Sequence, residues 1–228
     1  MRSAKTALHI PSKAVQGVVM LHGKSSTRFA SWVLPAVLAL ATTCVVPTAR
    51  AVEATDAHAH HHVAPDTKRS LASYAIPAVK LVRDDGRAVT LSEELDDGRP
   101  VVLSFIYTTC TTVCPVTSQA LSALQSKLGS ARDNVHLVSI SIDPEHDTPE
   151  RLREYAKRFG AGPEWQHYTG TQAASRTAQQ AFSVYRGDKM SHSPATLIRA
   201  VPGAQWVRLD GFATPDQLMA ELSFCLSK

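Results

Sequence analysis

The sequence predicts one α/β domain over residues 76–228, with a central mixed sheet flanked by helices. Two nearly continuous apolar runs, 100–107 and 135–142, are typical of strands buried on both faces. Segments whose apolar residues repeat at helical spacing follow each run, so strands and helices alternate along the chain. About 150 residues are enough to form one well-buried core.

The first predicted element of the domain is a hairpin. Residues 79–82 and 88–91 are strand-like and flank Asp84-Asp85-Gly86, a typical turn sequence. The buried strand 100–107 comes next. Pro115 then begins a helix that extends to residue 128, because proline is favoured in the first helical turn and leucines repeat at helical spacing after it.

The second buried strand, 135–142, leads to a helix over 149–159, with Thr148 as its expected cap. The remaining elements follow from shorter versions of the same patterns. They are strands 165–168, 195–199 and 205–209 and helices 172–182 and 215–226.

Composition and charge exclude several classes of protein. The 228 residues are 44% hydrophobic and 19% charged, as in ordinary globular proteins, which excludes wholesale disorder and a polytopic membrane protein. Residues 1–51 contain six basic residues and no acidic one, so the rest of the chain has 18 basic and 20 acidic residues and a formal charge of −2. No basic stripe remains to bind nucleic acid.

The N-terminal residues 1–51 have the layout of a secretory signal peptide. A basic lead precedes the uncharged segment 29–49, and Ala49-Arg50-Ala51 supplies small residues at a cleavage point. Two alternatives stay open, since segment 29–49 could persist as a short membrane anchor and Cys44 could carry a lipid. Met20 is a second candidate start residue. All of these interpretations predict export.

Residues 52–75 are predicted to form a flexible linker, because they contain few bulky apolar side chains. The linker contains four closely spaced histidines, His58, His60, His61 and His62. They are either part of a polar tail or a metal-catching tract of low specificity, since imidazole binds Cu, Zn and Ni.

Two cysteines carry the strongest chemical signal. Cys110 and Cys114 lie where the buried strand 100–107 gives way to the following helix, and this edge of an α/β sheet is a common ligand site. A helix N-terminus favours the thiolate form. A spacing of four places both sulfurs on one face, where they can share a metal ion or form a disulfide. A purely structural disulfide or two core cysteines are the alternatives.

Three segments carry a family resemblance. FIYTTCTTVCP at 105–115, SISIDPEHDTPE at 139–150 and REYAKRFG at 153–160 resemble signatures of the Sco/SenC family, and the similarity covers about residues 75–226. The resemblance implies a thioredoxin-like fold. It also implies one copper ion bound by Cys110, Cys114 and a distant histidine. Family members are exported, usually membrane-tethered copper chaperones or thiol–disulfide proteins for the CuA site of cytochrome c oxidase.

The resemblance places the distant histidine in the loop before strand 195–199, which identifies His192 as the third ligand. A solvated loop histidine is the alternative. The family commonly has Asp before this histidine, whereas this chain has Ser191, so the group that orients the imidazole must differ. Met190 could add a thioether, or it could be an ordinary loop methionine.

Asp143 and Asp147 follow the second buried strand, and the resemblance implies that they support the metal loop or contact a partner. An acidic loop that caps the next helix is the alternative. The donor set supports copper independently, because two thiolates and an imidazole select Cu(I) and tolerate Cu(II) or Zn(II). Three ligands leave a coordination position open for transfer.

The expected partners are the copper-site subunit of cytochrome c oxidase and either a thiol reductant or another copper carrier. The expected location is the bacterial periplasm, in solution or tethered to the inner membrane through residues 29–49. Two other functions compete. A metal-independent thiol–disulfide reductase would use Cys110 and Cys114 alone, and a peroxiredoxin-like peroxidase would use Cys114 in a T-x-x-C-P motif.

Overall fold

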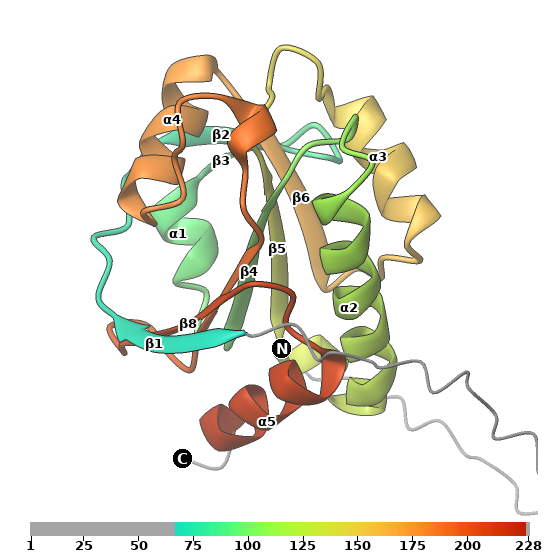
Figure 1. Cartoon of the computed structure of the whole chain (residues 1–228), viewed down its shortest axis with the longest axis vertical. Helices are drawn as coiled ribbons and strands as arrows, with labels where there is room; N and C mark the ends of the chain where they lie inside the picture. The colour runs from blue at the N-terminus through green and yellow to red at the C-terminus, as the bar shows by residue number, and fades with distance from the viewer. Residues whose placement is uncertain (1–66, 227–228) are drawn as a thin grey trace, which may run out of the picture. The chain divides into compact units, whose positions relative to one another are not determined.

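A computed structural model describes residues 67–226 (Figure 1). The predicted signal segment 1–51, with its tether 29–49, and the histidines at 58–62 lie outside the described residues. The strands are β1 (Lys68–Ala72), β2 (Lys80–Arg83), β3 (Ala88–Thr90), β4 (Val101–Ile106), β5 (His136–Ser141), β6 (Trp165–Gly170), β7 (Ala195–Arg199) and β8 (Trp206–Asp210). The helices are α1 (Leu91–Leu95), α2 (Val113–Leu128), α3 (Pro149–Arg158), α4 (Gln172–Ala181) and α5 (Pro215–Leu226).

All eight strands form one mixed sheet in the order β1-β8-β7-β4-β5-β6-β2-β3. The central strands β4, β5 and β6 are parallel, and every other neighbouring pair is antiparallel. The predicted hairpin is confirmed as β2 and β3, which join the sheet at β6. Gly86 adopts a φ of 88° in its turn, a conformation that glycine accommodates without strain.

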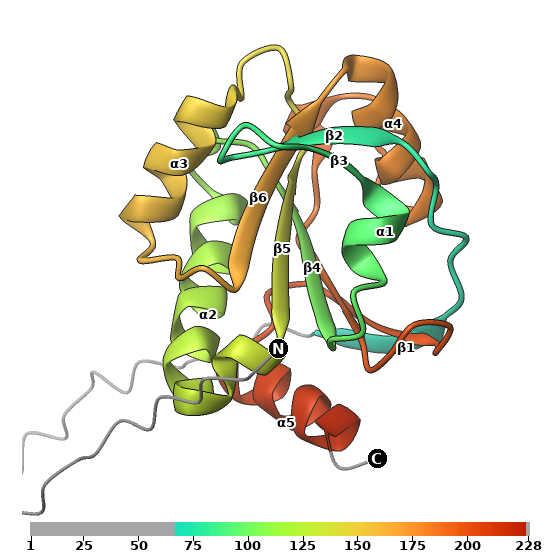
Figure 2. The ribbon, with the colours of Figure 1, turned by 180° about the vertical axis from the view of Figure 1, so that it is seen from behind.

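Helices cover both faces of the sheet, as predicted for two strands that are buried throughout. Helices α1 and α4 lie on one side of β4–β6, and α2 and α3 lie on the other (Figures 1 and 2). Along β4, alternate side chains face opposite layers, so Leu103 packs beneath α1 and α4 while Val102 packs beneath α2 and α5.

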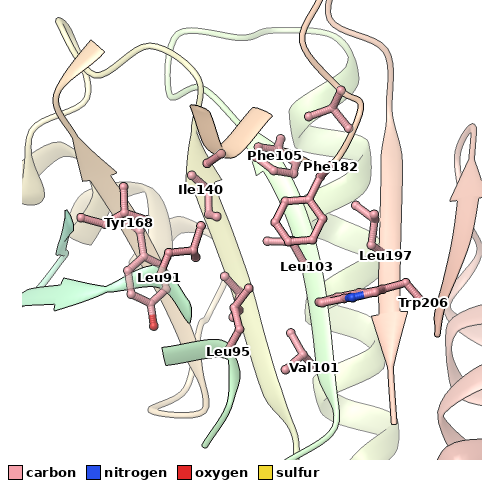
Figure 3. Close-up of a cluster of buried hydrophobic side chains, with 14 of the residues drawn as sticks. Leu91, Leu95, Val101, Leu103, Phe105, Ile140, Tyr168, Phe182, Leu197 and Trp206 are labelled. Atoms are coloured by element: carbon pink, nitrogen blue, oxygen red, sulfur yellow. The ribbon is translucent and has the colours of Figure 1, made fainter. Parts of the chain in front are cut away.

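The larger core cluster lies on the α1 and α4 side. Figure 3 shows Leu103 and Phe105 of β4 beside Phe182, with Trp206 of β8 lying next to Leu197 of β7. The rings of Phe105 and Phe182 are 5.9 Å apart, and those of Phe182 and Trp206 are 5.3 Å apart. This packing fixes β4 and β7 beside each other, and both strands adjoin the candidate site.

The predicted linker is too long, because residues 68–72 form strand β1 and pair with β8. Its partner lies more than 130 positions away, and three of its five residues are exposed, so local periodicity did not reveal it. Helix α2 begins at Val113 rather than Pro115, and Leu91 begins the unpredicted helix α1. Within residues 67–226, no helix is long and apolar enough to cross a membrane.

Candidate metal and dithiol site

The candidate site lies at the carboxyl ends of the parallel strands β4 and β5, where three loops meet. Strand β4 ends at Ile106 and leads through the two cysteines into α2, and the parallel strand β5 ends beside it at Ser141. Strand β7 is antiparallel to β4, with Thr196 opposite Ser104, so the loop that precedes β7 reaches the same end of the sheet. This loop contains His192.

Cys110 and Cys114 are both free and buried. The backbone N–H of Cys114, in the first turn of α2, donates a hydrogen bond to Sγ of Cys110 at 3.3 Å. The N–H groups of the first helical turn have no carbonyl acceptor within the helix. The Cys110 sulfur accepts from one of them and so acts as a cap for α2. The predicted proximity of the two cysteines at the start of a helix is therefore present.

The two thiols differ in acidity. Burial opposes ionisation of Cys110, but hydrogen bonds from the Cys114 thiol, from the backbone N–H groups of Cys114 and Thr112 and from Tyr107 outweigh it and lower its pKa to about 7. Burial and the neighbouring Cys110 raise the pKa of Cys114 well above its ordinary value. Near neutral pH, Cys110 is the nucleophilic sulfur and Cys114 is a protonated donor.

We expect iodoacetamide to alkylate Cys110 of the reduced, metal-free protein before Cys114. The rate at Cys110 should rise with pH and reach half its maximum at about pH 7. Peptide mass spectrometry of time courses across this pH range measures both sites. Faster labelling of Cys114 would contradict the assignment.

Tyr107 lies between the cysteines and the histidine loop. Its ring is almost fully buried and packs with Cys110 and Cys114. Burial, followed by the hydrogen bond to Cys110, raises its pKa to about 12, so the phenol stays a donor at neutral pH. The ring also meets His192 edge to face, with 6.4 Å between ring centroids.

The imidazole of His192 is held by a backbone carbonyl. Its Nε2 lies 3.0 Å from the carbonyl oxygen of Phe105. A carbonyl only accepts, so Nε2 carries the hydrogen and Nδ1 has a free lone pair. Burial lowers the pKa of His192, and Arg186 adds to this effect, which favours the neutral ring. Ligating histidines commonly bind a backbone carbonyl in this way, so Phe105 provides the orientation that Ser191 cannot.

We expect His192 to be the Nε2–H tautomer in the metal-free protein. Two-bond ¹⁵N–¹H spectra of the imidazoles distinguish the two nitrogens. His146 provides an internal comparison, because its Nδ1 lies 3.0 Å from a carboxylate oxygen of Asp143 and should carry the hydrogen. An Nδ1–H tautomer at His192 would show that the bond to Phe105 is absent in solution.

The three predicted ligands are only partly brought together. The structure joins the two cysteines, and His192 contacts the Tyr107 ring that packs with them. Among residues 67–226, no three His, Cys, Asp or Glu side chains are grouped closely enough to hold a metal ion. The chemistry of the donors still fits a soft metal, since two thiols and an unprotonated imidazole nitrogen reach one edge of the sheet.

Asp147 is fully buried and supports the cysteine loop. Its carboxylate accepts hydrogen bonds from the backbone N–H of Thr108 at 3.2 Å and from the hydroxyls of Thr108 and Ser141. The expected cap of α3 is confirmed as Thr148, whose hydroxyl accepts from the N–H of Arg151. Asp147 therefore ties the start of the cysteine loop to the end of β5.

Asp143 supports the histidine loop instead. Its carboxylate binds Nζ of Lys189 at 2.6 Å and Nδ1 of His146 at 3.0 Å. Burial opposes its ionisation, but these two hydrogen bonds hold its pKa below the usual value. Tyr107 and Lys189 are two residues of this site that were not predicted from the sequence. Tyr107 could have been found from its place directly after the buried strand, whereas Lys189 carries no local signal.

Comparison with known proteins agrees with this architecture. The SCO1/SenC family profile matches residues 68–223. The SCO1 protein homologue of Bacillus subtilis is 31% identical over 99 residues, 43% of this chain and 50% of that protein. The chain spans between 30% and 50% of the length of three curated relatives that it matches.

Solved structures give the same result. Arabidopsis thaliana ScoI, solved with copper bound, is 28% identical with a TM-score of 0.56, covering 67% of this chain and 99% of that one. BsSco, described as a member of the Sco family of cytochrome c oxidase assembly proteins, is 23% identical with a TM-score of 0.58, covering 68% and 95%. Sco proteins have a thioredoxin-like fold, and this chain shares it. The match over residues 68–223 shows that the chain belongs to the SCO1/SenC family.

Proposed function

We propose that this chain binds one copper ion through Cys110, Cys114 and His192. The observation that carries the proposal is the meeting of two free thiols and an unprotonated imidazole nitrogen at one sheet edge. Two thiolates and an imidazole are suited to Cu(I) and tolerate Cu(II). Arabidopsis ScoI, a relative of the same fold, has been solved with copper bound, which supports the same cargo here.

Each neighbouring residue has a place in this function. Cys110 ionises near neutral pH and offers the first thiolate, while Cys114 must lose its proton to offer the second. Asp147 positions the cysteine loop, and Asp143 positions the histidine loop through Lys189. Because Cys110, Cys114 and His192 are not grouped closely enough to hold a metal ion, metal binding requires this loop and the thiols to approach each other.

We further propose that the copper is delivered to the CuA site of cytochrome c oxidase, or that the thiols maintain the cysteines of that site. The copper-site subunit is then the client, and a thiol reductant or another copper carrier is the second partner. The family supports this proposal, because BsSco is described among cytochrome c oxidase assembly proteins. The basic lead and apolar segment of residues 1–51 favour export to the bacterial periplasm, in solution or tethered to the inner membrane.

A metal-independent thiol–disulfide reductase is the second candidate, and the unequal acidity of the two cysteines favours it. A thiol with a pKa of about 7 attacks a substrate disulfide as the thiolate, and a buried second thiol then resolves the mixed disulfide. In the complete reaction, two electrons and two protons pass from the pair to the substrate disulfide. This activity needs no histidine.

Anaerobic titration of the reduced full chain with Cu(I) against a chromophoric chelator tests the copper site. The histidines His58, His60, His61 and His62 are changed to alanine in this background chain, so that the tract does not add to the stoichiometry. We expect one tight equivalent. Cys114→Ser and His192→Ala should each weaken it by about a hundredfold or more, since each removes one of three ligands.

Two outcomes would redirect the proposal. Absence of tight binding by the background chain would overturn the copper site. Disulfide reductase activity that is unchanged in His192→Ala but lost in Cys114→Ser, together with absent copper binding, would favour the reductase instead.

A further inference from the structure

Met190 is an exposed methionine at the mouth of the candidate site. Met190 is 74% exposed, more than any other large apolar residue within residues 67–224. Exposure of an apolar side chain contributes nothing to the core. The two core clusters and the cluster around the cysteines do not include it. Its position therefore calls for a functional explanation that packing does not supply.

The backbone around Met190 is fixed although its side chain is exposed. The N–H of Met190 donates to the carboxylate of Asp188 at 3.0 Å. The next residue back, Lys189, binds the buried carboxylate of Asp143 at 2.6 Å, with its Nζ 5.8 Å from the centre of the Tyr107 ring. These contacts hold the loop backbone beside the Tyr107 ring and leave the thioether exposed.

The thioether and the dithiol pair contact the same tyrosine. The Tyr107 hydroxyl is within hydrogen-bonding distance of Sδ of Met190, at 3.9 Å, and the Tyr107 ring packs with Cys110 and Cys114. One phenol thus connects the sulfur of the exposed loop to the buried pair. Methionine is unbranched and flexible, so its sulfur can change position by side-chain rotation.

A thioether and an imidazole differ in the oxidation state of copper that they favour. Thioether sulfur is a soft ligand that selects Cu(I), whereas imidazole binds both Cu(I) and Cu(II). His192 is held by the Phe105 carbonyl, and its ring meets the Tyr107 ring edge to face. The loop therefore has two donors of different softness, two positions apart, both in contact with the tyrosine that packs with the thiols.

We infer that Met190 is a further copper ligand, which binds Cu(I) together with Cys110 and Cys114 at the mouth of the site. This inference rests on the proposed copper-binding function. The Tyr107 hydroxyl, which contacts Sδ of Met190 in this structure, would give up that contact when the thioether binds Cu(I). Met190 selects for the reduced ion, and His192 serves both oxidation states.

The test compares Met190→Leu with the background chain in anaerobic Cu(I) competition titrations and in Cu(II) titrations. Leucine keeps the apolar volume and removes only the sulfur. Met219→Leu is the matched control, because Met219 lies in α5 and packs against a different core cluster. X-ray absorption at the copper edge counts the sulfur ligands in each Cu(I) complex.

We expect Met190→Leu to weaken Cu(I) binding by about tenfold and to leave Cu(II) affinity within about twofold, since only the soft ligand is lost. The Cu(I) complex should lose one of three sulfurs, and Met219→Leu should change neither affinity nor sulfur count. If Met190→Leu has the same Cu(I) affinity and the same number of sulfur ligands as the background chain, the inference is overturned and the proposed copper site is unaffected. Loss of copper binding in Cys114→Ser shows independently that the site itself is present, and retention there would overturn the proposed site and this inference together.

Discussion

Replacing Asp147 by alanine is expected to lower the free energy of unfolding by about 3 kcal/mol. The carboxylate is fully buried and satisfies the backbone N–H and hydroxyl of Thr108 and the hydroxyl of Ser141. Alanine leaves these donors without an acceptor, so the start of the cysteine loop is no longer held to the end of β5. Urea unfolding of the reduced protein near neutral pH measures the change.

Two variants make this prediction specific. Asp147→Asn keeps one carbonyl acceptor for Thr108, and its amide can donate to Ser141, so it should lose only about 1 kcal/mol. Asp143→Ala removes a carboxylate that binds Lys189 and His146, whose side chains are 33% and 53% exposed. Because water can replace these contacts, it should also lose about 1 kcal/mol. Equal losses in Asp143→Ala and Asp147→Ala would contradict the proposed role of Asp147.

Protonation of His167 is expected to destabilise the fold in acid. Its ring is fully buried in β6, and neither nitrogen has a hydrogen-bond partner within the described residues. The Asp84 carboxylate is 3.8 Å from Nδ1 and does not compensate, so burial lowers the pKa of His167 to about 3. Below the ordinary imidazole pKa, His167 is protonated in the unfolded chain but stays neutral in the folded chain. Stability is therefore complete above about pH 6.5 and decreases toward pH 3 by up to about 1.4 kcal/mol per pH unit.

The His167→Phe variant tests this dependence. Phenylalanine keeps an aromatic ring against Trp165 and Tyr155, whose ring centroids lie 5.2 and 6.1 Å from that of His167. Between about pH 6.5 and pH 4.5, the free energy of unfolding of this variant should decrease by about 2–3 kcal/mol less than that of the parent. Trp165→Phe perturbs the same packing without removing a titrating group, so it should lower stability equally at both pH values. An identical slope in His167→Phe and the parent would show that His167 does not control acid stability.

Local chemistry in the sequence was sufficient to predict most of the elements. The apolar runs of β4 and β5, the Asp84-Asp85-Gly86 turn and the cap at Thr148 each depend on neighbours within a few residues. The same reasoning placed Cys110 and Cys114 together at a helix N-terminus. It failed for β1 because the pairing of Lys68–Ala72 depends on β8, which lies far along the chain.

The sequence by itself therefore determined the α/β class, the hairpin, the position of the two cysteines and, through its motifs, the family. Only the tertiary structure decided that Asp147 holds the cysteine loop, that Asp143 reaches the histidine loop and that Tyr107 contacts both His192 and the cysteines. The physical reason is distance along the chain. Thr108 and Asp147 are 39 positions apart and Phe105 and His192 are 87, so only the packing of the sheet brings each pair together.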